Sequence, residues 1–495
     1  MALMETTPSL YELFKRNSAE APEAPAFLIS AGDRSLPITW AHFIRDVEHI
    51  GWAIRTFLPK RAVIGLLGEN AYEWIVGHAA AVFSGSIVVP LDPTLTPEEM
   101  AERLRFVGAK FVAYSALYAE KAKATSKLLP GVPFGGFGSI EADHILETAE
   151  KKLRAGAPSI FDTPPDEDAV AMMVFTSGTT SRPRGVELTL RALSQFSECA
   201  MRSMPFSPGQ RSLMLLPLHH IFGIAVAYLF LSHRIAMGVC PDFRRLFDAV
   251  QRFRCNHLFL VPALAEILEQ KIARRGASTE AVLGTKLDWI GTGGAPLSPK
   301  TREAFTSLGV KMLNMYGLTE TCALFSMEPY DALREGTVGR VAPLSGVEAK
   351  VSEEGELLLR GPSIMKGYYA EPELTAKALK DGWFHTGDMG TIDADGYVRI
   401  TGRKNRTIVL SSGKKIAPEE LEEKLLHLPG LKEVMVRGEG ESRVLTAEVF
   451  ATVSEEIVRN EINALNLKLP LHKRIRAIVM RYEPFPRTAS GKIKV

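Results

Sequence analysis

The ten residues Thr176-Ser177-Gly178-Thr179-Thr180-Ser181-Arg182-Pro183-Arg184-Gly185 carry the most information about the fold of this chain. They follow an apolar run from Ala169 to Phe175 that is typical of a buried strand, and an amphipathic pattern from about Leu190 predicts a helix. A turn of this composition can offer N–H and O–H donors and positive charge to a polyphosphate. It is not a Walker A loop, because no Gly-Lys-Ser/Thr sequence closes it. An isolated Ser/Thr/Gly cluster is more often a polar loop, so its interpretation depends on the rest of the chain.

Composition excludes several classes of protein. The 495 residues suffice for two or more domains, and 46% hydrophobic with 23% charged residues is ordinary for a globular chain. With 59 basic and 57 acidic residues the net charge is only +2, which gives no sign of a nucleic-acid partner. The cysteines show neither a CxxC pair nor metal-ligand spacing, which indicates free thiols in a reducing compartment; they are Cys199, Cys240, Cys255 and Cys322.

Neither a leader nor a membrane span is expected. Residues 1–20 carry charges among their apolar residues and lack a signal-peptide core. The stretch from Leu213 to Leu231 has no Asp, Glu, Lys or Arg and is about long enough to cross a bilayer. Because Pro217, two histidines and Gly223 interrupt it, it predicts a buried strand, a turn and a helix instead. We therefore expect a cytoplasmic protein.

Strand and helix patterns alternate in the first two thirds of the chain, which predicts an α/β fold. Apolar runs typical of strands occur at Ala62–Leu67, Ile87–Leu91 and Phe111–Tyr114, and Pro97–Phe106 has a helical pattern. Thr163–Asp168 is a plausible connection to a second alternating unit that extends to about residue 330.

The pattern changes after residue 330. Short alternating runs follow, with a hairpin expected around Asp395-Gly396. In the tail, a helix is predicted from Pro418 to just before Pro429-Gly430, since proline suits a helix start and glycine a stop. The rest of the tail predicts two strands, Val444–Phe450 and Ile475–Met480, and a helix of about Glu455–Leu467.

Six motifs occur in a fixed order along the chain. After the opening loop come Leu216–Gly223 (LPLHHIFG), Gly291–Pro296 (GTGGAP), Met315–Thr321 (MYGLTET), Gly382–Asp388 (GWFHTGD) and Pro486–Ile493 (PRTASGKI). In this order they resemble the adenylate-forming superfamily, which contains acyl- and aryl-CoA synthetases, adenylation domains and firefly-type luciferases. The resemblance extends from about residue 10 to the end of the chain.

The resemblance implies a fold and a reaction. The fold is a large N-terminal domain, residues 1–404, followed by a small mobile α+β domain, residues 405–495. The large domain has two α/β subdomains and a small β-barrel-like subdomain, at about 1–165, 166–330 and 331–404. In the reaction a carboxylate attacks the α-phosphorus of Mg-ATP, releasing pyrophosphate, and a thiol then displaces AMP from the acyl adenylate. ATP, Mg²⁺, coenzyme A and a small carboxylic acid are the implied cofactors and substrate.

By resemblance, the residues around Mg-ATP have distinct roles. Glu320 and Thr176 are the expected Mg²⁺ ligands, since a hard dication takes oxygen ligands. Thr319 is expected at the α-phosphate and Tyr316 on the adenine. Taken alone, the Tyr-Gly-x-Thr-Glu pattern is a turn followed by a capped helix start. The full nucleotide-binding set is Thr176, Ser177, Gly178, Thr179, Thr180, Arg184, Gly293, Gly294, Ala295, Tyr316, Gly317, Thr319, Asp388, Arg403 and Lys492.

Residues further along the chain complete the implied site. Asp388 would accept hydrogen bonds from both ribose hydroxyls, which suits an ionised carboxylate, and Arg403 would help hold the ribose. Lys492 would reach from the small domain to the substrate carboxylate and the α-phosphate, where preorganised charge is worth about 3 kcal/mol or more. Asn405 would be the hinge, and Gly413 would lie where the pantetheine arm passes. Singly, these residues would be a turn residue, solvated charges and loop positions.

The acyl side of the site rests on two motifs. His220 matches a histidine near the acyl and adenylate carbonyl, and with Lys492, Glu320 and Thr319 it forms the expected catalytic set. Gly293 to Ala295 would form a backbone wall, where missing side chains permit close approach. The plainer alternatives are a core histidine and a turn between a strand and a helix.

Three positions depart from the usual pattern of the superfamily. Ser181 stands where glycine is usual, and Arg184 replaces lysine in the phosphate loop. Arginine keeps the charge but is a planar fork, so phosphate positioning can differ. Asn405 occupies a hinge position that is commonly Asp or Lys. None of these changes removes a catalytic group.

The acid is expected to be apolar. Residues Leu218–Gly223 contain no aspartate that could pair with an ammonium group, and the following residues are apolar, which suits an alkyl or aryl acid. The segment Arg403–Gly413 is most similar to bacterial fatty acyl-CoA ligases, so a long- or medium-chain fatty acid–CoA ligase is expected, with peripheral membrane contact as one way to collect the acid. Two alternatives stay open: transfer of the acyl group to a carrier-protein phosphopantetheine, and a non-catalytic nucleotide- or fatty-acid-binding protein.

Overall fold

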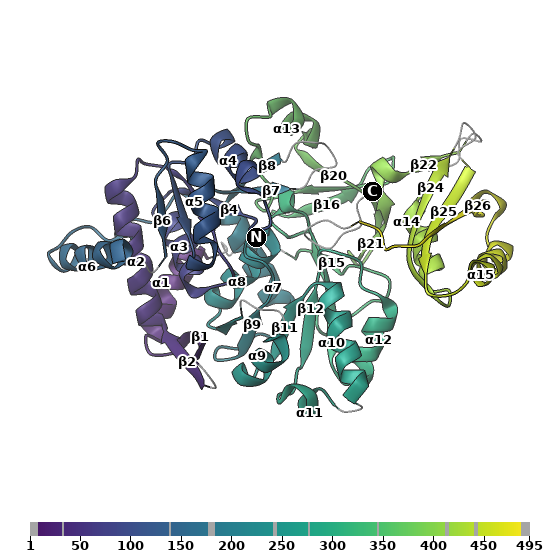
Figure 1. The fold of residues 1–495 in the computed structure, drawn as a ribbon, viewed down its shortest axis with the longest axis horizontal. Coiled ribbons are helices and arrows are strands. Elements are labelled where there is room, and N and C mark those ends of the chain that lie inside the picture. Colours follow the sequence, from purple (N-terminus) through teal and green to yellow (C-terminus); the bar gives the residue numbers. More distant parts are fainter. Residues whose placement is uncertain are drawn as a thin grey trace. The chain divides into compact units, whose positions relative to one another are not determined.

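The computed structural model describes residues 8–31, 34–137, 140–176, 184–240, 245–275, 278–343, 346–410, 415–439 and 444–486. The chain divides into two compact units. The first unit contains Met1–Glu348 and Arg360–Phe384, and the second contains Ala349–Leu359 and His385–Val495. Figure 1 shows the course of the chain, and each unit is described by itself below.

The largest sheet of the first unit is mostly parallel and is covered on both faces. Its order is β18 (Gly367–Tyr368), β8 (Arg184–Thr189), β7 (Val170–Thr176), β4 (Ile87–Leu91), β3 (Val63–Leu67), β5 (Phe111–Tyr114) and β6 (Phe134–Gly136). Alternate residues face opposite sides: Ile64 and Val88 join the core formed with α2, α3, α7 and α8, whereas Val89 and Val112 join the core formed with α4 and α5. The helices of the first unit that lie on or beside this sheet are α1 (Leu10–Glu20), α2 (Trp40–Phe57), α3 (Tyr72–Phe83), α4 (Pro97–Phe106), α5 (Ala119–Lys127), α6 (Ile140–Arg154), α7 (Leu190–Ser203) and α8 (Ile221–Ser232).

Two further sheets complete most of the first unit (Figure 1). One has the order β2 (Arg34–Thr39), β1 (Pro25–Ala31), β10 (Ala236–Val239) and β9 (Arg211–Met214). The other has the order β11 (His257–Leu260), β12 (Trp289–Thr292), β13 (Lys311–Tyr316), β14 (Ser326–Met327) and β15 (Arg340–Val341). Strands β11, β12 and β13 are parallel, so their carboxyl ends meet at one edge. The associated helices are α9 (Leu246–Phe253), α10 (Pro262–Arg275), α11 (Thr279–Leu283) and α12 (Pro299–Ser307).

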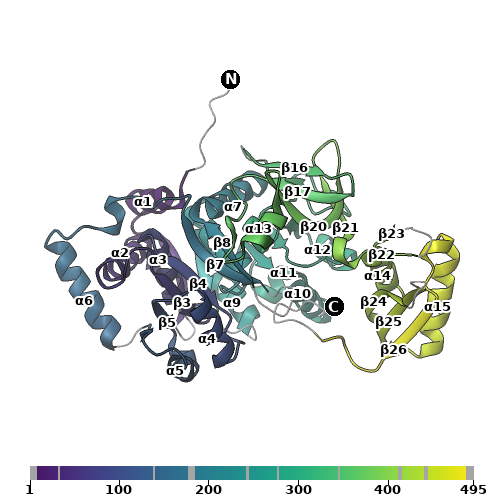
Figure 2. The same ribbon diagram turned by 90° about the horizontal axis from the view of Figure 1, so that it is seen from above.

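The remaining strands belong to a sheet that the chain enters twice and to the tail. That sheet has the order β16 (Glu348–Val351), β17 (Glu356–Arg360), β20 (Trp383–Ile392) and β19 (Leu379–Lys380), with β21 (Val398–Arg403) beside β20 and α13 (Pro372–Ala378) preceding β19. The tail contains β22 (Ile408–Val409) paired with β23 (Lys415–Ile416), then α14 (Pro418–Leu426) and a sheet of β24 (Leu431–Glu439), β25 (Val444–Ala451) and β26 (Ala477–Arg481). Figure 2 shows α14 and α15 (Glu455–Lys468) beside this sheet, and their leucines, valines and isoleucines share its core.

The structure confirms the expected α/β elements. Strands β4 and β5 and helix α4 have the predicted bounds. Helix α4 starts where it does because Thr96 and Glu99 form a capping box and Pro97 follows the cap. The stretch from Leu213 to Leu231 forms the end of β9, a turn and α8, as expected. Strand β26 begins two residues later than predicted, because the Ile475 N–H donates to the Asn466 side chain and not to a carbonyl of the neighbouring strand.

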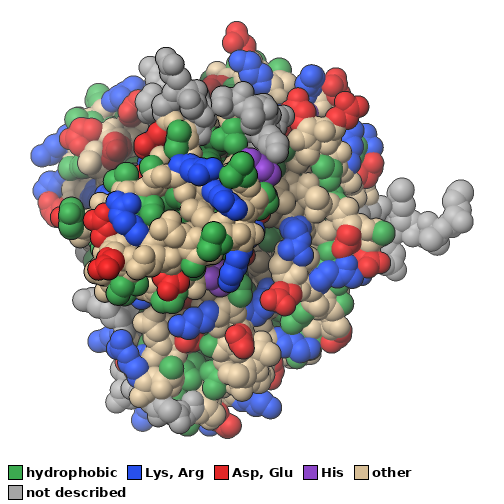
Figure 3. Space-filling model, turned by 90° about the vertical axis from the view of Figure 1, so that its right-hand side faces the viewer, with side chains coloured by type: hydrophobic (Ala, Val, Ile, Leu, Met, Phe, Trp, Pro, Cys, Tyr) green, Lys and Arg blue, Asp and Glu red, His purple; other side chains and the backbone are tan. Residues whose placement is uncertain are grey.

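The surface and the thiols also match the composition. All four cysteines are thiols outside any disulfide, as expected from their spacing, and each is buried. On the face in Figure 3, basic and acidic side chains are interspersed, in keeping with a net charge of +2. Within the described ranges, none of the helices combines the length and apolar character needed to cross a membrane.

Candidate functional site

The residues on either side of the opening loop lie opposite each other. Thr176 ends β7 and Arg184 begins β8, and the two residues are antiparallel register partners. The loop residues between them that were predicted to bind nucleotide, Ser177, Gly178, Thr179 and Thr180, lie outside the described residues. The strand pair therefore brings a hydroxyl and a guanidinium together at the base of the predicted phosphate loop.

Strand β18 adds a residue that sequence reasoning missed. The Tyr369 N–H donates to the Gly185 carbonyl at 2.8 Å, which holds β18 against β8. This places the Tyr368 hydroxyl where it donates to Glu320 Oε1 at 2.9 Å, and the Arg184 guanidinium lies 5.7 Å from the Tyr368 ring centroid. Burial, and then the Glu320 carboxylate, raise the pKa of Tyr368, so it is a neutral donor at pH 7. Tyr368 lies outside the six motifs, so no pattern in the sequence indicated that it contacts Glu320.

Glu320 is well suited to a single-carboxylate Mg²⁺ site. It lies in the 3₁₀ turn Thr319–Thr321, whose backbone is fixed by the Met365 N–H donating to the Glu320 carbonyl at 2.9 Å. Among the described residues, no group of three or more His, Cys, Asp and Glu is arranged to hold a metal. Mg²⁺ is usually held by one or two carboxylates together with substrate phosphates rather than by a full protein cage. The donors present fit that kind of site.

The carboxyl ends of β12 and β13 bring two predicted loops to one edge. Thr292 and Asn314 are parallel register partners, so Gly293–Ala295 and Tyr316–Thr319 leave the sheet side by side. Close packing requires glycine here: a Cβ on Gly317 would lie 2.2 Å from the Ala323 carbonyl oxygen, and one on Gly293 would lie 3.1 Å from the Met315 oxygen. In open α/β sheets ligands bind at this edge. Tyr316 is half-buried there, with its ring 5.3 Å from Phe325.

His220 is the N-cap residue of α8. The turn before it packs against α8 on one side and against Asn70 on the other. A Cβ on Gly223 would lie 2.2 Å from the Pro217 oxygen, so only glycine lets the helix pack against this turn. The Asn70 amide fixes the other side, donating to the Leu216 carbonyl at 2.9 Å and accepting from the Leu218 N–H at 3.1 Å. Asn70, which sequence reasoning did not single out, thus supports the histidine turn.

The neighbouring His219 is half-buried, with a side chain 15% exposed, and its surroundings differ from those of His220. Its Nε2 lies 3.7 Å from Asp92 Oδ1, and its ring centroid is 4.3 Å from that of His220. Burial and the nearby His220 lower the pKa of His219 to about 4, although Asp92 opposes this. His219 is therefore neutral at pH 7. The start of α8 also reaches the predicted wall, since Phe222 Cζ would lie 3.5 Å from a Cβ on Gly293.

In the second unit the structure pairs the two predicted ribose residues. Asp388 on β20 and Arg403 on β21 are antiparallel register partners, and Arg403 Nε lies 2.8 Å from Asp388 Oδ1. Asp388 is only 2% exposed, whereas the Arg403 side chain is 42% exposed. The Asp388 N–H donates to Thr386 Oγ1 at 3.0 Å. A buried, oriented carboxylate beside a more exposed guanidinium is able to accept hydrogen bonds from a ligand.

The turn Lys404–Arg406 contains the predicted hinge residue Asn405. Its flanking cations are held on both sides: Lys404 Nζ lies 2.7 Å from Glu354 Oε2, and Arg406 lies 3.0 Å from Glu419 and 2.6 Å from Glu422. Gly413 and Lys492 lie outside the described residues, so their predicted roles stay predictions.

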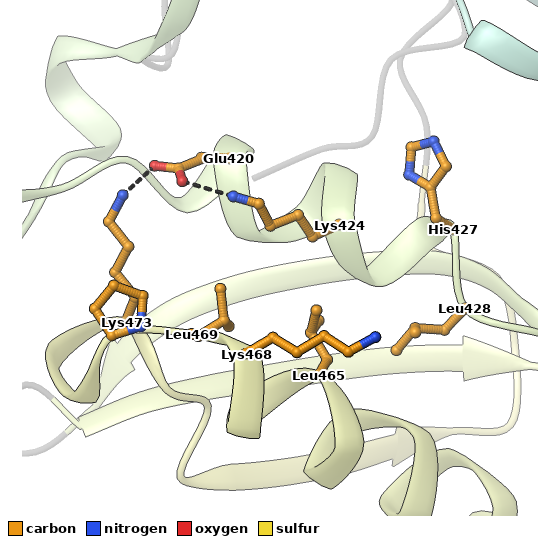
Figure 4. Close-up of a pocket in the computed structure, with 9 residues that line it drawn as sticks. Glu420, Lys424, His427, Leu428, Leu465, Lys468, Leu469 and Lys473 are labelled. Atoms are coloured by element: carbon orange, nitrogen blue, oxygen red, sulfur yellow. Dashed lines mark hydrogen bonds and ion pairs between the residues drawn. The ribbon is translucent and has the colours of Figure 1, made fainter.

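A pocket of about 580 Å³ lies in the second unit, and none of the residues that line it was predicted for the site (Figure 4). It is lined by residues of α14 and α15 and of the turns that follow these two helices: Glu420, Lys424, His427, Leu428, Leu465, Lys468, Leu469, Pro470 and Lys473. Figure 4 shows Glu420 between two lysines, at 2.8 Å from Lys424 Nζ and 2.6 Å from Lys473 Nζ. These ion pairs tie α14 to the turn after α15.

Comparison with known proteins agrees with this arrangement. The model of the AMP-binding enzyme family matches residues 14–369. The indoleacetate–CoA ligase of Aromatoleum aromaticum is 29% identical over 484 residues, covering 92% of each chain. The long-chain-fatty-acid–CoA ligase FadD15 of Mycobacterium bovis is 27% identical over 429 residues, covering 76% of this chain and 70% of that protein.

A solved structure gives the same picture of the fold. ATP-bound MatB from Rhodopseudomonas palustris superimposes with a TM-score of 0.82 at 26% identity, covering 98% of this chain and 97% of that one. The family model spans well over half of the chain, and the resemblance seen in the six motifs is confirmed. The chain belongs to the AMP-binding enzyme family, the adenylate-forming enzymes.

Proposed function

We propose that this protein is an ATP-dependent acid–CoA ligase. In the first step a carboxylate oxygen of the acid attacks the α-phosphorus of ATP, and the bond to pyrophosphate breaks. In the second step the sulfur of coenzyme A attacks the acyl carbonyl, the bond to AMP breaks, and the thiol proton is lost to solvent. The observation that carries the proposal is the Glu320 carboxylate, fixed by Tyr368 beside Arg184 at the base of the predicted phosphate loop.

Residues of both units would act in the first step. Glu320, with Thr176, would hold Mg²⁺, which neutralises developing phosphate charge when bound. Thr319 and Arg184 would bind phosphate oxygens, and Tyr316 with Gly293, Gly294 and Ala295 would enclose the adenine. Asp388 and Arg403 would hold the ribose. Lys492 would stabilise charge between the acid and the α-phosphate.

The second step needs the acyl group to be presented to a thiol. His220 would lie beside the acyl carbonyl, and Gly413 would let the pantetheine arm pass close to the backbone. Asn405 would be the hinge residue about which the small domain turns before the second step. These roles come from the resemblance of the motifs.

The identity of the acid is the finer part of the proposal. The apolar start of α8, with Phe222 against Gly293, supports an acid with an apolar body. Relatives carry names for fatty-acid, indoleacetate, ferulate and 2-succinylbenzoate substrates. We take a fatty acid as the first candidate because of the segment Arg403–Gly413, and arylalkanoic acids as the second. Such an acid could be collected at a membrane surface.

The test is a panel of acids from acetate to palmitate, with benzoate, indoleacetate and ferulate, scored by AMP formation. The proposal expects at least one acid to give AMP that depends on both the acid and coenzyme A. Acid-dependent pyrophosphate release that coenzyme A does not accelerate, with acyl transfer to a phosphopantetheinylated carrier protein, would instead support the carrier-protein alternative. ATP binding without turnover of any acid would support a non-catalytic binding protein.

A further inference from the structure

A buried carboxylate that the proposed reaction does not use lies behind the predicted ribose residues. Glu356 begins β17 and is only 3% exposed, yet it makes several strong contacts. Its Oε1 accepts from the Gly387 N–H at 2.9 Å, and its Oε2 lies 2.9 Å from Lys404 Nζ and 3.3 Å from His385 Nδ1. A buried carboxylate with this many partners is costly to remove, because the Gly387 N–H would lose its acceptor and Lys404 would lose one of its two carboxylates.

The contacts of Glu356 hold the segment that ends in Asp388. His385 and Gly387 bond to Glu356 itself, and Thr386 Oγ1 donates to the next carbonyl, that of Leu357, at 2.7 Å. Thr386 then accepts the Asp388 N–H at 3.0 Å. Gly387 has a φ of +72°, a left-handed conformation that favours glycine, and its N–H is aimed at Glu356 in that conformation.

The same carboxylate also holds the strand that supplies Arg403. Consecutive residues of β21 and the following turn reach two carboxylates: Arg403 reaches Asp388 at 2.8 Å and Lys404 reaches Glu356 at 2.9 Å. Burial alone would raise the pKa of Glu356, but Lys404 and the Gly387 N–H outweigh it and hold the pKa below its usual range. Glu356 is therefore ionised at pH 7, and it contacts β20 and the turn that directly follows β21.

We infer that Glu356 is a positioning residue that orients Asp388 and Arg403 for the ribose of ATP and links them to Lys404, the residue before the predicted hinge. The inference rests on the proposed function for the ligand of Asp388. It assigns Glu356 no contact with ATP. Its effect on the nucleotide passes through the 385–388 segment and through Lys404.

A graded pair of variants with a matched control tests this role. Glu356→Ala removes every acceptor, whereas Glu356→Gln keeps an oxygen for the Gly387 N–H and loses the charge opposite Lys404. Glu354→Gln is the control, because Glu354 also pairs with Lys404, at 2.7 Å, but its side chain is 63% exposed. Kd for ATP and for 2′-deoxy-ATP is measured by calorimetry on the full chain, and KM for ATP and for the acid by AMP formation.

We expect Glu356→Ala to raise Kd and KM for ATP about tenfold and Glu356→Gln about threefold, with KM for the acid unchanged. The preference for ATP over 2′-deoxy-ATP should shrink in the same order, which a loss of stability alone would not produce. Glu354→Gln should stay within about twofold of the wild type.

The inference is overturned if Glu356→Gln binds ATP and 2′-deoxy-ATP as the wild type does, or if KM for ATP and for the acid rise equally. If Glu356→Ala does not fold, the glutamine variant still decides the matter. A wild-type chain that binds no ATP would overturn the proposed function itself, whereas wild-type binding with unchanged variants overturns only the role of Glu356.

Discussion

The two carboxylates assigned to the nucleotide, Glu320 in the first unit and Asp388 in the second, are held in opposite ways. Glu320 is half-buried, and its carboxylate accepts a hydrogen bond from the neutral hydroxyl of Tyr368 at 2.9 Å. Asp388 is 2% exposed and faces the Arg403 guanidinium at 2.8 Å. A neutral donor leaves the charge of Glu320 available to a cation, whereas a guanidinium neutralises Asp388 and leaves it as an oriented hydrogen-bond acceptor. The surroundings of the two carboxylates thus suit the different roles proposed for them, a metal ligand at Glu320 and a ribose acceptor at Asp388.

The largest effect is expected at Glu320. Glu320→Gln should lower kcat/KM by about 100-fold or more, since a group that stabilises phosphate charge is lost. Raising Mg²⁺ should recover part of the activity, which steady-state kinetics over a Mg²⁺ titration will show. Glu303→Gln, on the exposed surface of α12, is the control and should match the wild type. A loss at Glu320 that is independent of Mg²⁺ would contradict the role of cation ligand.

Asp388 should behave differently. Asp388→Asn should raise KM for ATP about tenfold, because a charge-assisted acceptor is lost and Arg403 loses its partner. The effect should not depend on Mg²⁺, and 2′-deoxy-ATP should be used nearly as well as ATP by the variant. Unchanged discrimination between these nucleotides would show that Asp388 does not bind the ribose.

A smaller effect is expected at Tyr368. Tyr368→Phe removes one hydrogen bond to Glu320 and keeps the ring beside Arg184, so kcat/KM should fall about fivefold, with weaker apparent Mg²⁺ affinity. Parallel Mg²⁺ titrations of Tyr368→Phe and Glu320→Gln measure this. If the phenylalanine variant is as impaired as the glutamine variant, Tyr368 has a role beyond holding Glu320.

The smallest effect concerns the stability of the fold and the half-buried His219. Because burial lowers its folded pKa to about 4, the unfolded chain binds the proton first as pH falls below about 6.5. The stabilisation is therefore fully present above pH 6.5 and is lost as pH falls from there toward 4. The resulting decrease in the free energy of unfolding between pH 7 and pH 5.5 is about 1 kcal/mol. Urea unfolding at both pH values should show a smaller decrease for His219→Gln than for the wild type, and an equal decrease would contradict the account.

The sequence was sufficient for the elements and the family, but not for the supporting contacts. Helix α4 was predictable because its capping residues are local, and strand β4 because its apolar run is continuous. The start of β26 was predicted two residues too early, because the Ile475 N–H donates to the side chain of Asn466, nine residues earlier in the chain. No local pattern reveals this contact. Thr176 and Arg184 fell within one predicted loop, because strand β8, which pairs with β7, was not predicted. Tyr368 reaches Glu320 from 48 positions away in the chain. Glu356 likewise acts on Gly387 from 31 positions away. Its role follows only from the pairing of β17 with β20.

The most direct test of the central claim follows the oxygen atoms of the acid. The acid of the panel with the fastest AMP formation is labelled with ¹⁸O in its carboxylate and turned over with ATP, Mg²⁺ and coenzyme A. If an acyl adenylate forms, one labelled oxygen must appear in the phosphate of AMP, and Lys492→Ala should strongly slow its appearance. Unlabelled AMP with the label in inorganic phosphate or pyrophosphate, or no AMP from any acid of the panel, would contradict the account.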